Sequence, residues 1–399
     1  MTVHTFFVKG IAHNSYIVGG DGRCAVIDPR RDVRLYVEAA RELGLRITRI
    51  LETHLHADFV SGHVELARLT GARIYAPKSA RCRFPHVPLA EGDSFRLENM
   101  RFSVLETPGH TPEHISYVVT NLNRGPEPVA VFCGDTLFVG DVGRPDLFPG
   151  QAESLASKLY DSLHAKVLAL PDHCEVYPAH GAGSLCGKAI ADKRSSTVGY
   201  ERRYNAALRI KDRKAFVRAL TVGMPPAPDH FARCSEINRR GPAPVAGLPP
   251  LAELEPAAFA RRAGARGAVV VDVRPYDAFG GQHVPGAVSL DLAGNFATFA
   301  GWVLPPETDI FLVAGDRAEA EEAAVWLRRV GLDRVRGWLL GGMPAWVKAG
   351  LATAHVAQVS APELRRMIAR KEQLAVVDVR APGEFAAGHI AGAVNVPAP

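Results

Sequence analysis

The sequence has few cysteines and no long apolar run, and these shortages exclude several classes of protein. Its six cysteines all lie between Cys24 and Cys234 without a CxxC spacing, which argues against a disulfide framework and against a zinc site built of thiolates. No apolar stretch approaches the length of a membrane span, and the first residues lack the basic and apolar segments of a signal peptide. We therefore expect a cytoplasmic protein with no membrane partner.

The chain also has little excess charge. A formal net charge of +5 over 399 residues is too small to indicate a nucleic-acid partner. The hydrophobic content of 47% is sufficient for two or three domains, each with its own core. We expect no nucleic-acid binding, and we predict that the chain assembles as a homo-oligomer.

The clearest chemical signal is the stretch THLHADFVSG at residues 53–62. It follows an apolar run at 47–51, which predicts a buried strand, and it precedes a predicted helix at 64–69. Positions i, i+2 and i+4 of an extended segment point the same way, so His54, His56 and Asp58 could converge on one metal ion. Spacing alone leaves all three as candidate ligands.

Three later strands end in the same manner, with a His or an Asp in the loop that follows. His110 comes after a predicted hairpin, Asp135 after the strand at 129–132, and His180 after the strand at 174–177. A lone His is more often hydrogen bonded in a core or at a surface, and Asp135 could simply cap a turn. Their repeated placement at strand ends favours a metal site on loops above a rigid sheet.

The motifs THLHAD, TPGHT, GDT and YPAHG, in this order, resemble the metallo-β-lactamase superfamily. The resemblance covers residues 1 to about 240 and implies a four-layer αββα sandwich with these loops at one edge. The segments HADFVSG and FVGDVGRPDL resemble the persulfide dioxygenases of this superfamily, particularly the branch fused to rhodanese domains. That resemblance implies one Fe(II) per chain, held by His54, His110 and Asp135. This ligand set leaves one face of the ion open.

Phe59 is the informative departure from the superfamily. The two-zinc hydrolases of the superfamily usually have a His directly after the Asp of the motif, which is Asp58 here, and that His binds the second metal. A phenylalanine ring cannot donate a lone pair, so we expect a single metal ion. We place His56, Asp58 and His180 around the ligands or in the pocket wall, where they would orient the ligands and tune the metal.

Three further residues near these motifs have two interpretations each. Arg144, in the GRPDL segment, and Tyr177, just before the Pro-Ala-His turn, are candidates to position a loop or the substrate, although each could equally make a structural hydrogen bond. Cys186 could accept a persulfide, but a small buried thiol is the commoner role for such a cysteine.

The resemblance implies that the enzyme oxidises a low-molecular-weight thiol persulfide, of the glutathione or coenzyme A type, with O2 to sulfite and the parent thiol, as in sulfide detoxification. Two alternatives remain. A zinc thioester hydrolase of the glyoxalase II type shares the positions of His54, His110 and Asp135, but Phe59 and the rhodanese fusion count against it. A non-catalytic sulfur-carrier or docking protein is opposed by the complete ligand set.

An internal repeat follows the proline-rich stretches at 225–228 and 240–244, which predict an extended linker. The motifs VVDVR and H-x-x-G-A-V recur 106 residues later (376 − 270 = 106), and both copies resemble rhodanese domains. We therefore predict an α/β chain with three parts. They are a metallo-β-lactamase-fold domain at 1–245, an α/β/α rhodanese-like domain at 246–352, and a truncated second rhodanese-like unit at 353–399.

Neither rhodanese-like copy carries the cysteine that such domains use. The first has Ala314 at the expected nucleophile position, after a predicted strand at 310–313. A methyl group cannot form a persulfide, so we expect this copy to be inactive in sulfur transfer and to serve packing or docking. The second copy has no cysteine and reaches Pro399 before its own active-site loop, so we expect it to pack incompletely.

Overall fold

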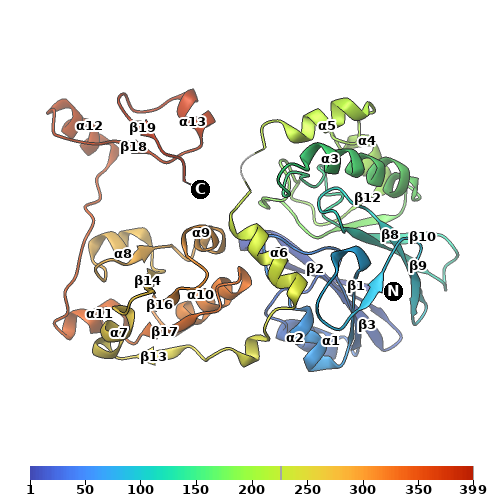
Figure 1. The fold of residues 1–399 in the computed structure, drawn as a ribbon, viewed down its shortest axis with the longest axis horizontal. Coiled ribbons are helices and arrows are strands. Elements are labelled where there is room, and N and C mark those ends of the chain that lie inside the picture. Colours follow the sequence, from blue (N-terminus) through green and yellow to red (C-terminus); the bar gives the residue numbers. More distant parts are fainter. Residues whose placement is uncertain (225–226, 399) are drawn as a thin grey trace. The chain divides into compact units, whose positions relative to one another are not determined.

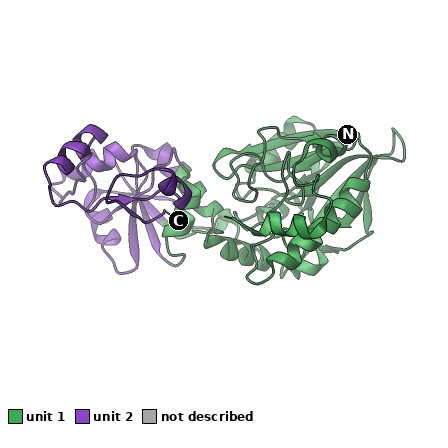
Figure 2. Cartoon of the chain, turned by 90° about the horizontal axis from the view of Figure 1, so that it is seen from above, with its two compact units in different colours: residues 1–250, 295–307, 322–335 green, residues 251–294, 308–321, 336–399 purple. Residues whose placement is uncertain are grey.

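The computed structural model describes residues 1–224 and 227–398. Pro225 and Pro226, which belong to the expected linker, and Pro399 lie outside the described residues. The chain divides into two compact units (Figures 1 and 2). Unit 1 contains residues 1–250, 295–307 and 322–335, and unit 2 contains residues 251–294, 308–321 and 336–399. Within the described ranges, every helix is too short or too polar to span a lipid bilayer.

Unit 1 contains two sheets, and the first is mixed. Its strands, in order across the sheet, are β1 (Thr2–Val8), β2 (His13–Gly20), β3 (Arg23–Ile27), β4 (Arg46–Leu51), β5 (Arg73–Pro77) and β6 (Val87–Leu89). The first three strands pair antiparallel, and β3 to β6 pair parallel. The parallel connections pass through α1 (Arg34–Glu42) and α2 (His63–Thr70).

The second sheet of unit 1 is largely antiparallel. Across the sheet its strands are β12 (Ser196–Thr197), β11 (Glu175–Pro178), β10 (Pro128–Gly134), β9 (Ile115–Asn121), β8 (Met100–Glu106) and β7 (Ser94–Leu97). The neighbouring helices are α3 (Ala152–Asp161), α4 (Val198–Tyr204) and α5 (Arg213–Thr221). Only β10 and β11 pair parallel in the described part of this sheet, so both strands deliver their following loops to the same edge.

Side-chain alternation along the strands builds the four layers of unit 1. Tyr16 on β2 and Tyr117 on β9 point into one core shared by the two sheets. Their neighbours face outward: Ile17 joins the core under α1 and α2, and Val118 joins the core under α3 and α5. Because successive side chains of a strand alternate between its faces, both sheets bury both faces. The result is the expected αββα sandwich.

The expected linker is in part a helix. Residues 230–240 form α6 (His230–Arg240), which buries Phe231, Cys234 and Asn238. The prolines that flank this segment indicated an extended chain, but its apolar residues recur at helical spacing and pack inward. The linker expectation is therefore wrong for α6, and this helix contributes to the site described below.

Unit 2 is built on a parallel sheet of the order β13, β17, β16, β14, β15. These strands are β13 (Ala252–Leu254), β14 (Ala268–Asp272), β15 (Val288–Ser289), β16 (Asp309–Val313) and β17 (Val335–Leu339). The helices are α7 (Pro256–Ala263), α8 (Tyr276–Gly281) and α11 (Gly342–Lys348), together with the first part of α10 (Arg317–Arg329). The helix α9 (Phe296–Val303) and the end of α10 belong to unit 1.

The second repeat lacks a core of its own. It contains α12 (Ala361–Ala369), β18 (Val377–Asp378), α13 (Pro382–Ala387) and β19 (Val394–Asn395). Among the described residues from 351 to 398, no side chain is buried. This exposure agrees with the expectation of an incompletely packed unit.

Candidate metal centre

Three side chains from different strand ends converge in unit 1. His54 follows β4, His110 lies in the loop between β8 and β9, and Asp135 follows β10. All three are fully buried, and their ligand atoms lie within 4.8 Å of one another. Oδ2 of Asp135 lies 3.8 Å from Nε2 of His54 and 3.2 Å from Nε2 of His110. This spacing suits two imidazoles and a carboxylate around one ion.

Two orphaned nitrogen atoms indicate that a metal fits here. The Nε2 atoms of His54 and His110 are buried and have no hydrogen-bond partner among the described residues. Leaving a buried polar atom unpaired costs about 1–3 kcal/mol, and a metal ion would take both lone pairs. The residues present therefore fit the metal that the superfamily implies.

Each ring makes a hydrogen bond on its far side, and that of His110 fixes its tautomer. Nδ1 of His110 lies 2.9 Å from the backbone carbonyl oxygen of Arg144. A carbonyl can only accept, so Nδ1 carries the proton and Nε2 keeps its lone pair. Nδ1 of His54 lies 2.9 Å from Oγ1 of Thr53, a hydroxyl that can either donate or accept.

The electrostatic environment also prepares the ligands. Burial and the neighbouring rings of His56 and His114 hold the pKa of His54 well below its usual range. Burial lowers the pKa of His110 as well, although Asp135 opposes this shift. Burial works against ionisation of Asp135, but the adjacent rings of His180 and His110 hold its pKa below the usual range. The result is two neutral imidazoles and one carboxylate, the forms that bind a metal.

His180 lies between two carboxylates rather than among the three ligands. Its Nδ1 is 2.7 Å from Oδ1 of Asp135, and its Nε2 is 2.9 Å from Oδ2 of Asp58. Burial alone would lower the pKa of His180, but Asp135 and Asp58 raise it well above its usual range. His180 therefore donates from both nitrogens and orients Asp135.

Cys186 joins this second cluster as a buried thiol. Its sulfur and the ligand atoms of Asp58 and His180 lie within 4.8 Å of one another. Burial, followed by the nearby charges of Asp135 and Asp58, raises the pKa of Cys186 well above its usual range. Since the thiolate is the nucleophile, this environment favours the interpretation of Cys186 as an unreactive buried thiol.

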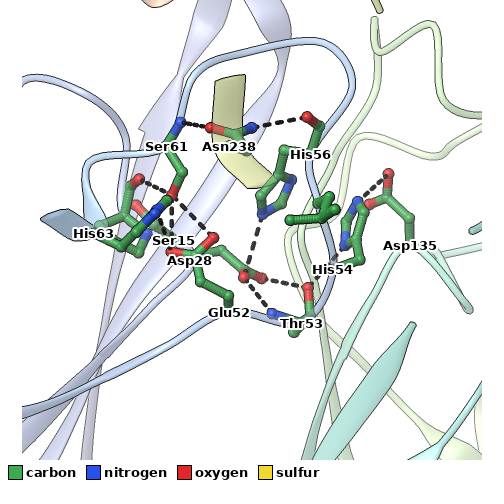
Figure 3. A network of polar contacts seen from close by, with 12 residues as sticks. Ser15, Asp28, Glu52, Thr53, His54, His56, Ser61, His63, Asp135 and Asn238 are labelled. Carbon is green, nitrogen blue, oxygen red and sulfur yellow. Dashed lines mark hydrogen bonds and ion pairs between the residues drawn. The ribbon is translucent and has the colours of Figure 1, made fainter. Parts of the chain in front are cut away.

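His56 turns away from the three ligands. Figure 3 shows His54 directed towards Asp135 and His56 directed towards Asp28; Nε2 of His56 is 3.2 Å from Oδ1 of Asp28. The ring of the fully buried Phe59 packs 4.4 Å from the ring of His56. The structure thus separates His56 from the ligand cluster, although spacing along the strand end left it as a candidate.

Arg144 and Tyr177 occupy different environments. The buried guanidinium of Arg144 donates to both carboxylate oxygens of Asp146 at 2.7 Å, while its carbonyl orients His110. Tyr177 instead stacks its ring on Phe132 and donates its hydroxyl to Glu175 at 2.8 Å. The side chain of Arg144 thus braces a loop of the centre, whereas that of Tyr177 is engaged outside the cluster.

Sequence reasoning missed the residue that anchors the metal loop, residues 53–62. Asn238 of α6 donates Nδ2 to the carbonyl oxygen of His56 at 2.9 Å, and its Oδ1 accepts from the amide of Ser61 at 2.8 Å (Figure 3). Its Nδ2 also donates to the carbonyl oxygen of Phe59 at 2.8 Å. No local pattern marks Asn238, because its partners lie about 180 positions earlier in the chain. His114, whose Nε2 accepts from the amide of Asp135 at 3.0 Å, was also missed, although it follows the TPGHT motif closely.

A cavity of ≈ 470 Å³ borders the centre. Leu55 and Ala57, which alternate with the histidines of the metal loop, line it together with Thr111, the neighbour of His110. The remaining wall is largely apolar and includes Leu147, Phe148, Pro149 and Phe231. Its volume and largely apolar wall are those of a small-molecule site, lined on one side by the sequence neighbours of His54 and His110.

Comparison with known proteins gives the family. Residues 8–180 match the Metallo-beta-lactamase superfamily, and residues 255–349 and 360–399 match the Rhodanese-like domain. The hydroxyacylglutathione hydrolase of Pseudomonas entomophila (strain L48) is 31% identical over 218 residues, which are 54% of this chain and 79% of that protein. The chain belongs to the metallo-beta-lactamase superfamily. It is a metal-dependent enzyme of that superfamily, and the predicted fold class is confirmed.

Two solved structures extend the comparison. The metallo-beta-lactamase from Staphylococcus aureus subsp. aureus COL is similar over 85% of this chain and 98% of that chain, with a TM-score of 0.76 and 31% identity. ETHE1 from Myxococcus xanthus is similar over 60% of this chain and 98% of that chain, with a TM-score of 0.53 and 28% identity. The first likeness extends beyond the superfamily domain into the rhodanese-like part, because it covers more of the chain than residues 8–180.

Proposed function

We propose that the chain is a mononuclear non-haem iron dioxygenase that oxidises a low-molecular-weight thiol persulfide. The observation that carries this proposal is the set of His54, His110 and Asp135, with His56 directed away from it and Phe59 at the usual place of a second-metal ligand. Two imidazoles and one carboxylate are typical of Fe(II) oxygenases, which need open coordination positions. A two-zinc hydrolase would need a further ligand where Phe59 stands.

The proposed reaction is balanced with dioxygen and water. One persulfide, one dioxygen and one water molecule give the parent thiol, sulfite and two protons. Ferrous iron, when bound, supplies the activation of dioxygen towards the terminal sulfur. The sulfur is oxidised, dioxygen is reduced, and the sulfur–sulfur bond breaks on hydrolysis.

The chain's own residues would hold the ligands and exclude water. His180 donates Nδ1–H to the carboxylate of Asp135, at 2.7 Å from Oδ1 and 3.0 Å from Oδ2, and so holds it beside the two imidazoles. Leu55 and Phe231 give the cavity an apolar wall that would take the aliphatic part of a thiol. Burial raises the pKa of Glu113 at the same wall.

The described lining of the cavity includes a paired cation. Arg239 on α6 donates from Nε and Nη2 to the carboxylate of Glu236, which stands one turn earlier on the same helix and lines the same cavity. We propose that carriers of the glutathione or coenzyme A type, which bear anionic groups remote from the sulfur, enter with those groups towards this part of the lining.

A hydrolytic function is the second candidate. The hydroxyacylglutathione hydrolases of Pseudomonas entomophila (strain L48) and Pseudomonas putida (strain GB-1) are 31% and 32% identical to this chain. This similarity supports the hypothesis that the substrate of this chain is a thioester. Asp58 and His180 also stand beside Asp135, as part of a second metal site would. Phe59 counts against this candidate because it removes a ligand from that site.

Metal content and substrate use separate the candidates. The purified full chain is analysed for iron and zinc, and oxygen uptake is measured with glutathione persulfide beside cleavage of a hydroxyacylglutathione thioester. The proposal expects about one iron per chain and sulfite formed in proportion to the oxygen consumed. Zinc with thioester cleavage would support the hydrolase, and neither activity would point to a carrier or docking protein.

A further inference from the structure

A buried carboxylate stands directly behind the ligand His54. Asp28, at the end of β3, accepts from the amide of Thr53 at Oδ1 and from the Thr53 hydroxyl at Oδ2, both at 2.8 Å (Figure 3). It is 1% exposed and has a φ of 49°. Such a left-handed conformation is uncommon outside glycine, and a buried one is held by its surroundings.

The direction of these hydrogen bonds reaches the metal ligand. A threonine hydroxyl has one proton, and this proton is directed to Asp28. Oγ1 of Thr53 can then only accept from Nδ1 of His54, which lies 2.9 Å away. The proton of the His54 ring must therefore be on Nδ1, and the lone pair on Nε2 points towards Asp135.

We propose that Asp28 is a positioning residue that sets the tautomer of His54 through the hydroxyl of Thr53. Without this relay the ring could carry its proton on Nε2, where it would block the metal. The inference rests on His54 as a metal ligand and holds for iron or zinc, so it stands or falls separately from the proposed reaction.

The two ligand histidines differ in how their tautomers are set. His110 donates to a backbone carbonyl, that of Arg144, which no side-chain substitution can turn into a donor. His54 depends on a hydroxyl, which can either donate or accept. A change at Asp28 should therefore reverse the tautomer of His54 and leave that of His110 unchanged, so the ring of His110 is an internal control.

The substitution Asp28→Asn reverses the relay with little change in shape. The Asn carbonyl oxygen must still accept from the amide of Thr53, so the Asn amide group faces Oγ1 of Thr53 and donates to it. The hydroxyl then donates to Nδ1 of His54, and the ring proton moves to Nε2. His56 keeps an oxygen atom as its neighbour, because it lies beside the Oδ1 position.

The first measurement is metal affinity of the full chain, by chelator competition with Fe(II) and with Co(II). We expect Asp28→Asn to weaken binding about 10- to 100-fold, the usual effect of losing such a supporting group. Asp272→Asn, which changes an equally buried carboxylate in unit 2 that pairs with Arg274, should leave the affinity unchanged. An Asp28→Asn affinity within twofold of the wild type would overturn the proposal.

The second measurement reads the tautomer itself. In the chelated full chain with 15N-labelled histidine, the ring nitrogen signals should show the proton of His54 on Nδ1 in the wild type and on Nε2 in Asp28→Asn, with His110 unchanged. If Asp28→Asn does not fold, Thr53→Val and Thr53→Ser take its place. The valine variant should bind Co(II) more weakly and the serine variant normally; equal affinity of the two would refute the relay.

Discussion

The helix α6 should control the order of the metal loop through a single side chain. Asn238 is 1% exposed and makes three hydrogen bonds to the loop, with His56, Phe59 and Ser61. Each such bond contributes about 1 kcal/mol, so Asn238→Ala should make local opening of the loop easier by about 3 kcal/mol. Because 1.4 kcal/mol is a factor of ten, amide exchange of Ser61 should accelerate roughly 100-fold.

The assay is hydrogen exchange of the loop peptide, combined with metal affinity. Asn205→Ala is a matched control for the loop, because Asn205 is fully buried in the same unit and donates to Asp141 and Glu201 instead of to residues 53–62. Asn205→Ala should destabilise its own surroundings and leave exchange of the Ser61 amide unchanged. If Asn238→Ala leaves Ser61 as protected as in the wild type, α6 does not hold the loop and the reasoning is wrong.

Three further results are expected. Asp135→Ala should abolish metal binding between His54 and His110, since no other carboxylate of the described residues shares a ligand group with these two imidazoles, and retained metal with activity would contradict the ligand set. Burial lowers the pKa of His63 to about 3, so between pH 6.5 and 3 the unfolded chain takes up a proton at this residue that the folded chain does not. The free energy of unfolding should therefore fall on acidification, and His63 should account for up to about 1.4 kcal/mol of this fall per pH unit. The fall should be less steep in His63→Gln and as steep as in the wild type in a variant of the exposed His173. Ala314→Cys should not restore thiosulfate sulfurtransferase activity unless Glu319→Ala accompanies it, because the Glu319 carboxylate accepts from the amide of Gly315 at 2.8 Å and occupies the loop that would hold the persulfide.

The sequence predicts the metal ligands better than it predicts the residues that hold these ligands in place. His54, His110 and Asp135 lie in loops directly after strands, where short-range patterns are informative, and the structure brings them together. Asn238 and Asp28 carry no such signal, because their partners lie 177 to 182 and 25 positions away and their roles depend on tertiary packing. Dependence on tertiary packing also explains α6. The flanking prolines favoured an extended linker, whereas burial of Phe231 and Cys234 stabilises a helix.

The charges of the centre link metal binding to substrate binding. Asp135 and Asp58 flank one imidazolium, His180, and the carboxylate of Asp28 stands behind His54, while the two ligand imidazoles are neutral, so the buried centre has an excess of negative charge. A buried excess charge is costly and would repel the proposed anionic persulfide. A divalent ion would offset this excess and give an anionic sulfur an opposite charge to bind. The chelated chain should therefore not retain labelled glutathione persulfide in equilibrium dialysis, whereas the metal-loaded chain should; equal retention by both would mean that the thiol is held by the cavity wall alone.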